Sequence, residues 1–121
     1  MRQRWQDDLK KLMTDIKQWA SSAGWKVDSI QREIEEVSIG LYSAEELIIN
    51  ISANKRIHIE VMGRGDEYSP GKVEMFAWPT LIRVLFFKKD EWSIRTDATM
   101  LLDNLNEESF IKYAGLITGD D

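Results

Sequence analysis

The sequence predicts an α+β fold: a two-layer sandwich in which an antiparallel meander sheet of about five to six strands carries an N-terminal and a C-terminal helix on one face. Residues 56–99 are rich in β-branched and aromatic residues, which favour strands, and are centred on the run from Val73 to Phe87. Segments near both ends repeat their apolar residues at helical spacing. Along successive strands the apolar residues alternate, so they share one face of the sheet.

Length and composition limit the possibilities further. A chain of 121 residues and 14.1 kDa predicts a single domain, 1–121. The net charge of −5 argues against non-specific binding to nucleic acid, so we expect no such partner. The chain has no cysteine, and we find neither a signal peptide nor a membrane span, so we expect a cytoplasmic protein with no membrane partner.

Residues 3–22 predict an amphipathic helix that ends near Gly24. The polar positions between its apolar residues form the opposite face. We expect the apolar face to pack on the sheet, with a partner helix as the other interpretation. Its apolar residues are Trp5, Leu9, Leu12, Met13, Ile16, Trp19 and Ala20.

Residues 26–40 fit either a helix or a strand. We interpret them as a solvated edge strand, in which Glu33, Glu35 and Glu36 protect the edge against unwanted pairing. Residues 40–46 predict a turn or a short helical loop, and residues 47–52 a second strand.

The remaining strands are predicted at residues 56–62, 73–78, 81–87 and 92–99. Pro79 has no backbone donor, so a bend is expected there. Residues 100–105 predict a connection to a last helix, which Asn104 or Asn106 caps and whose first turn contains Glu107 and Glu108. The apolar face of that helix is formed by Phe110, Ile111, Ala114 and Ile117.

The alternation separates two faces of the sheet. One face is uniformly apolar and available to the helices: Ile57, Ile59, Val61, Val73, Met75, Ala77, Ile82, Val84, Phe86 and Ile94. The other mixes large apolar groups with both signs of charge: His58, Glu60, Met62, Phe76, Trp78, Arg83, Leu85, Phe87, Arg95 and Asp97. Nothing in the chain remains to cover this second face. It is either a binding surface or the outside of a curled sheet whose residues pack on each other. A register shift at Pro79 would exchange the faces of the later strands.

Two groups of polar residues are candidate sites. His58 beside Glu60 has the chemistry of a general base, but with no second histidine and no cysteine we predict no transition-metal site. Glu60, Arg64, Arg83, Arg95 and Asp97 form either a phosphate-binding cluster or an ordinary ladder of salt bridges. Asp66 and Glu67, in the loop at 63–72, offer at most a weak cation site. We predict no catalytic residues, metal or cofactor.

The runs I-H-I-E-V, G-K-V-E-M-F-A-W-P-T-L-I-R-V and W-S-I-R-T-D resemble a pattern of small bacterial α+β proteins without an assigned function, over about a third of the chain. In size and acidity the chain is also similar to type III secretion chaperones, but those insert a helix between their strands, for which residues 63–99 leave little room.

The function predicted first is a non-enzymatic interaction module that binds another protein, or a second copy of itself, through the second face. An immunity protein and a chaperone both fit that description. The predicted binding residues are Arg64 and nine residues of the mixed face: His58, Glu60, Met62, Phe76, Trp78, Arg83, Phe87, Arg95 and Asp97. The alternative is a small-molecule or nucleotide-phosphate domain, with or without enzymatic activity, that uses the arginine and carboxylate cluster.

Overall fold

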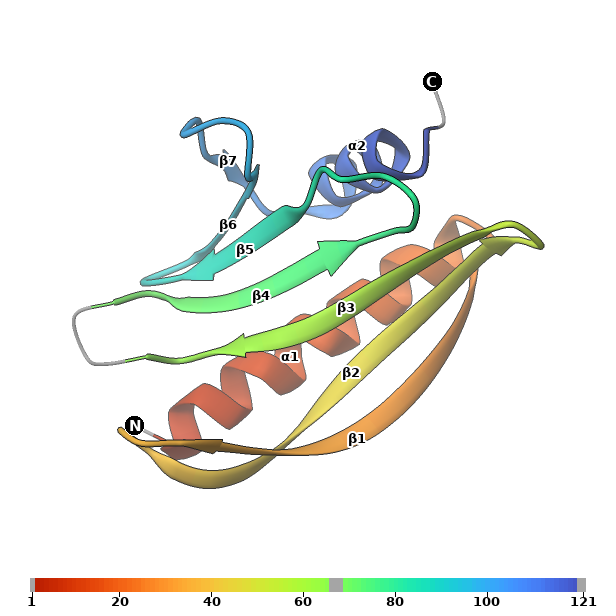
Figure 1. Ribbon diagram of the computed structural model, residues 1–121. Coiled ribbons are helices and arrows are strands. Elements are labelled where there is room, and N and C mark those ends of the chain that lie inside the picture. Colours follow the sequence, from red (N-terminus) through yellow and green to blue (C-terminus); the bar gives the residue numbers. More distant parts are fainter. Residues whose placement is uncertain (1, 66–68, 120–121) are drawn as a thin grey trace.

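The computed structural model describes residues 2–65 and 69–119 (Figure 1). The elements follow in the order α1 (Arg2–Ser22), β1 (Lys26–Glu36), β2 (Gly40–Ser52), β3 (Lys55–Gly63), β4 (Gly71–Phe76), β5 (Val84–Lys88), β6 (Trp92–Thr96), β7 (Asp103–Asn104) and α2 (Glu107–Thr118).

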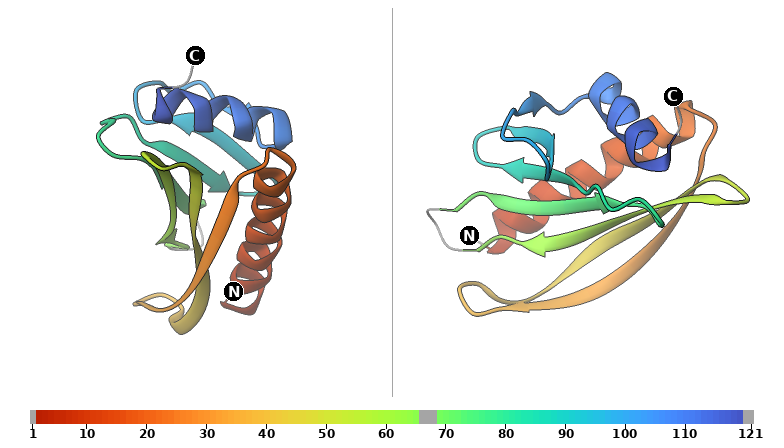
Figure 2. Two further views of the ribbon diagram at one scale, coloured as in Figure 1. Left: turned by 90° about the vertical axis from the view of Figure 1, so that its right-hand side faces the viewer. Right: turned by 45° about the horizontal axis from the view of Figure 1, so that its top comes forward.

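The strands form one antiparallel sheet in the order β1-β2-β3-β4-β5-β6-β7, so each strand pairs with the next in sequence. Both helices lie on one side of this curved sheet, with α2 crosswise near the end of α1 (Figure 2). The predicted α+β sandwich with a meander sheet is therefore confirmed. The described residues form seven strands, slightly more than the expected five to six.

Helix α1 buries the apolar face that the sequence predicts. Trp5, Leu9, Leu12, Met13, Ile16 and Ala20 are buried, and Trp19 packs partly exposed against the core. Gly24 has a φ of +83°, a left-handed conformation that favours glycine directly after a helix. Trp19 and Trp25 both contact Phe110 of α2, with ring centroids 5.6 and 6.4 Å apart. Aromatic contacts thus join the two helices over the sheet.

The N-terminal strands confirm one prediction and correct another. β1 is an exposed edge strand, as expected. The turn or helical loop predicted at 40–46 is wrong, because β2 begins at Gly40 and Tyr42 and Ala44 pair with Ile34 and Arg32 of β1. The sequence S-A-E-E around Glu45 has good helix formers. Long-range pairing and the burial of Tyr42 and Ala44 outweigh that local preference.

Several boundaries in the second half of the sheet also differ. β4 ends at Phe76 rather than at residue 78, so Trp78 lies in the connection to β5. β5 begins at Val84 rather than at residue 81, because residues 81–83, which follow the bend at Pro79, do not pair with β4. β6 ends at Thr96 rather than at residue 99. The predicted connection at 100–105 contains β7, which pairs with β6 at Ser93 and Ile94.

The strand register is preserved across Pro79. Val73 pairs with Phe86 and Met75 with Val84, so the two faces expected from alternation continue into β5. Apart from Ile82, which is half-buried, every residue of the predicted apolar face is buried in the core.

Helix α2 begins as predicted at one of the two candidate caps. The Asn106 side chain accepts from the Ser109 backbone N–H, and the Ser109 hydroxyl accepts from the Asn106 N–H, both at 2.9 Å. Glu107 and Glu108 lie in the first turn. Tyr113 joins Phe110, Ala114 and Ile117 in the buried face, whereas Ile111 is only half-buried.

Beyond the point where β2 and β3 stop pairing, two carboxylate side chains accept hydrogen bonds from backbone N–H groups. The β2–β3 register begins at Leu47, so residues 40–46 pair with β1 alone among the described strands. The Glu46 side chain accepts the Val61 N–H at 2.9 Å, and the Glu36 side chain accepts the N–H groups of Arg64 and Gly65 at 3.0 Å. Backbone donors of β3 and the loop after it are therefore satisfied by side chains.

Candidate functional site

The face of the sheet opposite the helices is the candidate site, and we call it the open face. In Figure 1 both helices lie behind the strands, so the open face of β3, β4 and β5 is turned toward the viewer. Neighbouring strands bring the predicted residues into register: His58 pairs with Phe76, and Leu85 with Arg95. The alternation of the sequence predicted these placements.

The first half of the open face centres on Phe76. The His58 ring stacks on it with a centroid separation of 5.3 Å and an interplanar angle of 12°. The Arg83 guanidinium lies 4.8 Å from the same ring and forms a salt bridge with Glu74. Phe76 is therefore held between two nitrogen-bearing side chains, an arrangement that fixes its position while leaving it partly exposed.

The second half centres on Phe87. The Arg95 guanidinium lies 4.9 Å and the Lys72 Nζ 5.8 Å from the Phe87 ring centroid. Arg95 Nη1 also donates to the carbonyl oxygens of Thr96, at 3.0 Å, and Thr99, at 2.9 Å. Arg95 thus joins the open face to the loop that follows β6.

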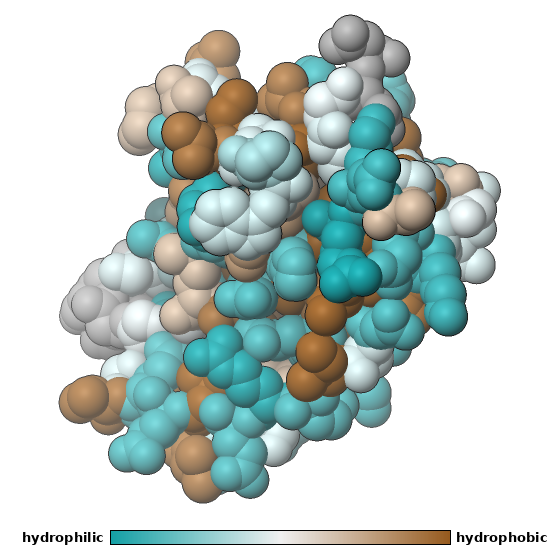
Figure 3. Space-filling model, turned by 45° about the vertical axis from the view of Figure 1, so that its right-hand side comes forward, coloured by the Kyte–Doolittle hydropathy of each residue, from teal (hydrophilic) through white to brown (hydrophobic). Residues whose placement is uncertain are grey.

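Large apolar side chains project from both ends of the open face. Trp78 is 69% exposed and Met62 is also exposed. Sequence reasoning placed Leu81 in a strand, but it is 85% exposed in the connection to β5. Figure 3 shows apolar side chains (brown) projecting in separate groups from a largely hydrophilic surface.

Sequence reasoning missed a further apolar group, the M-L-L run of the β6–β7 loop. Met100 is 82%, Leu101 79% and Leu102 56% exposed. The signal was present, because three consecutive large apolar residues in a loop are unusual. With Phe87 and Arg95, Met100 and Leu102 line a hollow of about 290 Å³.

The predicted cluster of arginines and carboxylates does not assemble into one pocket. Arg83 and Asp97 do meet, since the Arg83 N–H donates to Asp97 Oδ1 at 3.2 Å. The guanidinium of Arg83 is bound to Glu74, and that of Arg95 to backbone carbonyl oxygens. Arg64 follows β3, where its guanidinium donates to the Ser69 carbonyl. The guanidinium groups therefore already have partners.

The other polar predictions give no assembled site. His58 is half-buried and stacked on Phe76, and Glu60 lies two residues along the same strand, opposite Glu74. Asp66 and Glu67 lie outside the described residues. Over residues 2–65 and 69–119, no group of three or more histidine, cysteine or carboxylate side chains has the arrangement needed to hold a metal ion.

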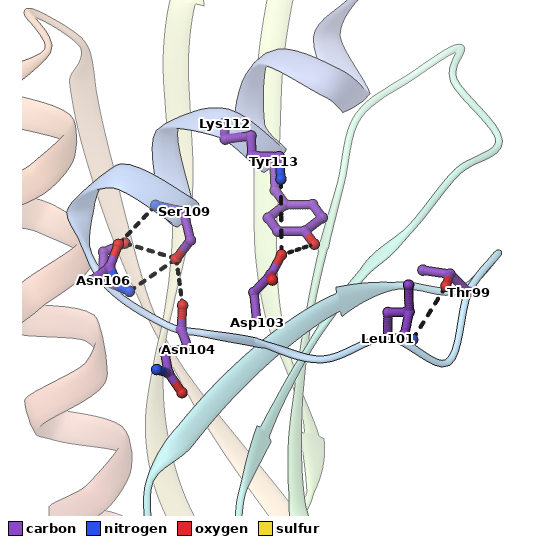
Figure 4. Close-up of polar contacts among 8 residues, drawn as sticks. All are labelled: Thr99, Leu101, Asp103, Asn104, Asn106, Ser109, Lys112 and Tyr113. Carbon is purple, nitrogen blue, oxygen red and sulfur yellow. Dashed lines mark hydrogen bonds and ion pairs between the residues drawn. The ribbon is translucent and has the colours of Figure 1, made fainter.

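A polar cluster at the start of α2 is structural (Figure 4). The Tyr113 hydroxyl donates to Asp103, and the Lys112 Nζ lies 3.9 Å from the same carboxylate. The hydrogen bond to Asp103, with burial as the next cause, raises the pKa of Tyr113 to about 12. Together with the Asn106–Ser109 cap, these contacts fix β7 against α2.

A larger hollow of about 450 Å³ lies between the start of α1 and the β5–β6 turn. Its lining carries both signs of charge, from Arg4, Asp8, Arg64, Lys88, Lys89 and Asp90. Four of these side chains are basic and two are acidic, so the lining is mixed in charge with an excess of basic groups.

Searches of protein-family models, of curated proteins and of solved structures found no match to this chain. Within the described part of the chain, no helix combines the length and the apolar character that crossing a membrane requires.

Proposed function

We propose that this protein is a non-enzymatic interaction module that binds another protein, or a second copy of itself, through the open face. One observation carries the proposal: both helices pack on one side of the sheet, and no described element covers the other side (Figures 1 and 2). Such a surface, with exposed aromatic and arginine side chains, has the composition of a protein interface.

The arrangement of the aromatic rings adds support. Phe76 and Phe87 are each contacted by cationic or imidazole side chains, so their positions are set before a partner arrives. Trp78 is 69% exposed, so a partner could bury much of its large ring. Groups that are already ordered lose less conformational entropy on binding, which favours affinity.

We propose two classes of partner. A toxin neutralised by this chain and a client escorted by it would both use such a face, in a small bacterial protein of the cytoplasm. The alternative, a nucleotide-phosphate site, has less support because the guanidinium groups of Arg83 and Arg95 already bind Glu74 and backbone carbonyl oxygens.

The test replaces Trp78 and Phe87 with serine and measures two properties of the full chain. These are its mass in solution, by light scattering, and the proteins that the immobilised chain retains from a cell extract. We expect the substitutions to remove either self-association or a retained protein while the circular dichroism spectrum stays native.

Leu116→Ser is the matched control, because Leu116 is an exposed apolar residue of α2, on the helix side of the sheet. Loss of binding in the control as well would show that general hydrophobicity is responsible. Unchanged mass and unchanged retention in the Trp78/Phe87 variant, with the fold intact, would refute the proposal.

A further inference from the structure

We propose that the hollow between Phe87 and the β6–β7 loop binds an acidic segment of a partner protein, with one large apolar side chain of that segment seated between Met100, Leu102 and Phe87. We call this hollow the β6–β7 groove. The inference rests on the proposed function and gives it a location and a partner chemistry.

The groove has a fixed wall. Arg95 Nη1 donates to the carbonyl oxygens of Thr96 and Thr99. Thr99 Oγ1 accepts from the Leu101 N–H at 3.2 Å, as Figure 4 shows. After the loop, β7 pairs again with β6. Hydrogen bonds at both ends of the β6–β7 loop thus hold Met100 and Leu102 in place. Both side chains remain exposed, so packing within the chain does not account for their position. Exposing fixed apolar side chains is unfavourable unless a partner covers them.

The charge around the groove selects the partner. The lining contains Lys89 and Arg95, and the Lys72 Nζ lies 5.8 Å from the Phe87 ring centroid. Among the described residues that line the groove, none is acidic. The whole chain carries a net charge of −5, so this is a local basic region on an acidic protein. The basic side chains attract an acidic segment to this groove and repel a basic one.

The size of the groove argues for side chains of a protein rather than a whole cofactor. Its volume of about 290 Å³ is at the lower end of the range of roughly 300–1,000 Å³ that is typical of small-molecule sites, which is enough for one large side chain with its neighbours. Its walls are mostly apolar, from Pro70, Phe87, Met100 and Leu102, with cations beside them. That combination suits a leucine- or phenylalanine-sized side chain flanked by carboxylates.

The experiment selects random dodecapeptides, displayed on phage, against the immobilised full chain. We expect the enriched peptides to share a large apolar residue flanked by aspartate or glutamate. A synthetic consensus peptide is then titrated with the protein by fluorescence anisotropy. Met100→Ser combined with Leu102→Ser should weaken its binding by about tenfold or more. Lys89→Glu should weaken binding and reduce its dependence on salt.

Two matched variants separate the possible outcomes. Leu116→Ser removes an exposed leucine on α2 and should leave binding unchanged. Trp78→Ser alters the open face away from the groove. If the peptide is lost with Trp78→Ser but not with the Met100/Leu102 change, the groove is refuted while the proposed function stands. Failure to enrich any peptide, or enrichment of basic peptides, overturns the inference, and the solution-mass and retention measurements still decide the proposed function separately.

Discussion

Gly71 is a position where one added methyl group should destabilise the fold severely. Gly71 is the first residue of β4 and lies against the Trp5 ring of α1, which is 1% exposed. A Cβ built on Gly71 would lie 2.3 Å from Cζ3 and 2.6 Å from Cη2 of Trp5. Favourable contacts between carbon atoms are about 3.5–4.0 Å long. Gly71→Ala therefore requires Trp5 or the strand to move by about 1 Å.

Trp5 has little freedom to move. Its Nε1 donates to the Tyr42 hydroxyl at 3.1 Å, and its ring centroid lies 6.0 Å from that of Trp92. Overpacking of a core typically costs about 1–3 kcal/mol. Alanine in a strand is otherwise favoured over glycine by about 0.5–1 kcal/mol, which offsets part of that cost. Because the contact of 2.3 Å is so close, the upper end of that range applies, and after the offset we expect Gly71→Ala to lower the free energy of unfolding by about 2 kcal/mol.

The free energy of unfolding is measured by urea titration, with tryptophan fluorescence and circular dichroism as the two signals. We expect the m value to be the same in the variant and the wild-type chain. The matched background is Trp5→Leu, which removes the ring atoms that the new Cβ would meet. In that background Gly71→Ala should be neutral or slightly stabilising, which makes the two substitutions strongly coupled. The same loss in both backgrounds, or a gain in the wild-type chain, would contradict the reasoning.

Three further predictions concern polar contacts. Glu46→Ala leaves the buried Val61 N–H without an acceptor and should lower the free energy of unfolding in urea by about 1–3 kcal/mol. Glu46→Gln keeps an acceptor and should cost less. Equal losses in the two variants would refute the role of Glu46 as the acceptor for Val61. Asn106→Ala should cost about 1 kcal/mol through loss of the N-cap, measured in the same way, and no change would show that the cap is dispensable. The folded-state pKa of Tyr113, about 12, lies above its ordinary value of about 10, so its stabilisation is complete below pH 10 and is lost as the pH rises toward 12. Ultraviolet titration should show this late transition, and Asp103→Asn should lower it; an unchanged titration would exclude the hydrogen bond as its cause.

The two faces of the sheet could be predicted because strand alternation is local information. Within one strand, successive side chains point to opposite faces of the sheet. The buried residues between Ile57 and Ile94 could therefore be assigned to one face strand by strand, without knowing which strands pair. The register across Pro79 required the structure, since a one-residue shift there would have been compatible with the same pattern.

The parts that could not be predicted depend on contacts between distant residues. The first half of β2 is a strand because Tyr42 and Ala44 pair with β1 and are buried, whereas its composition alone favours a helix. The β6–β7 groove depends on where Arg95 anchors the loop, and no local pattern around Met100 predicts that anchor. In the same way, the partners of Arg83 became known only from the structure.

The separation of β2 from β3 makes the outer half of the β1–β2 hairpin an arm. This arm is attached to the body by side chains: Glu36 and Glu46 bind backbone N–H groups beyond the last paired residues, and Gln6 Nε2 of α1 donates to the Ser43 carbonyl at 3.2 Å. Side-chain attachments of this kind can break together without disturbing the ladder from β3 to β6. Backbone amides at the tip of the arm should therefore exchange with solvent well before those of the central strands, and fraying of the first turns of α1 should release the arm as one unit.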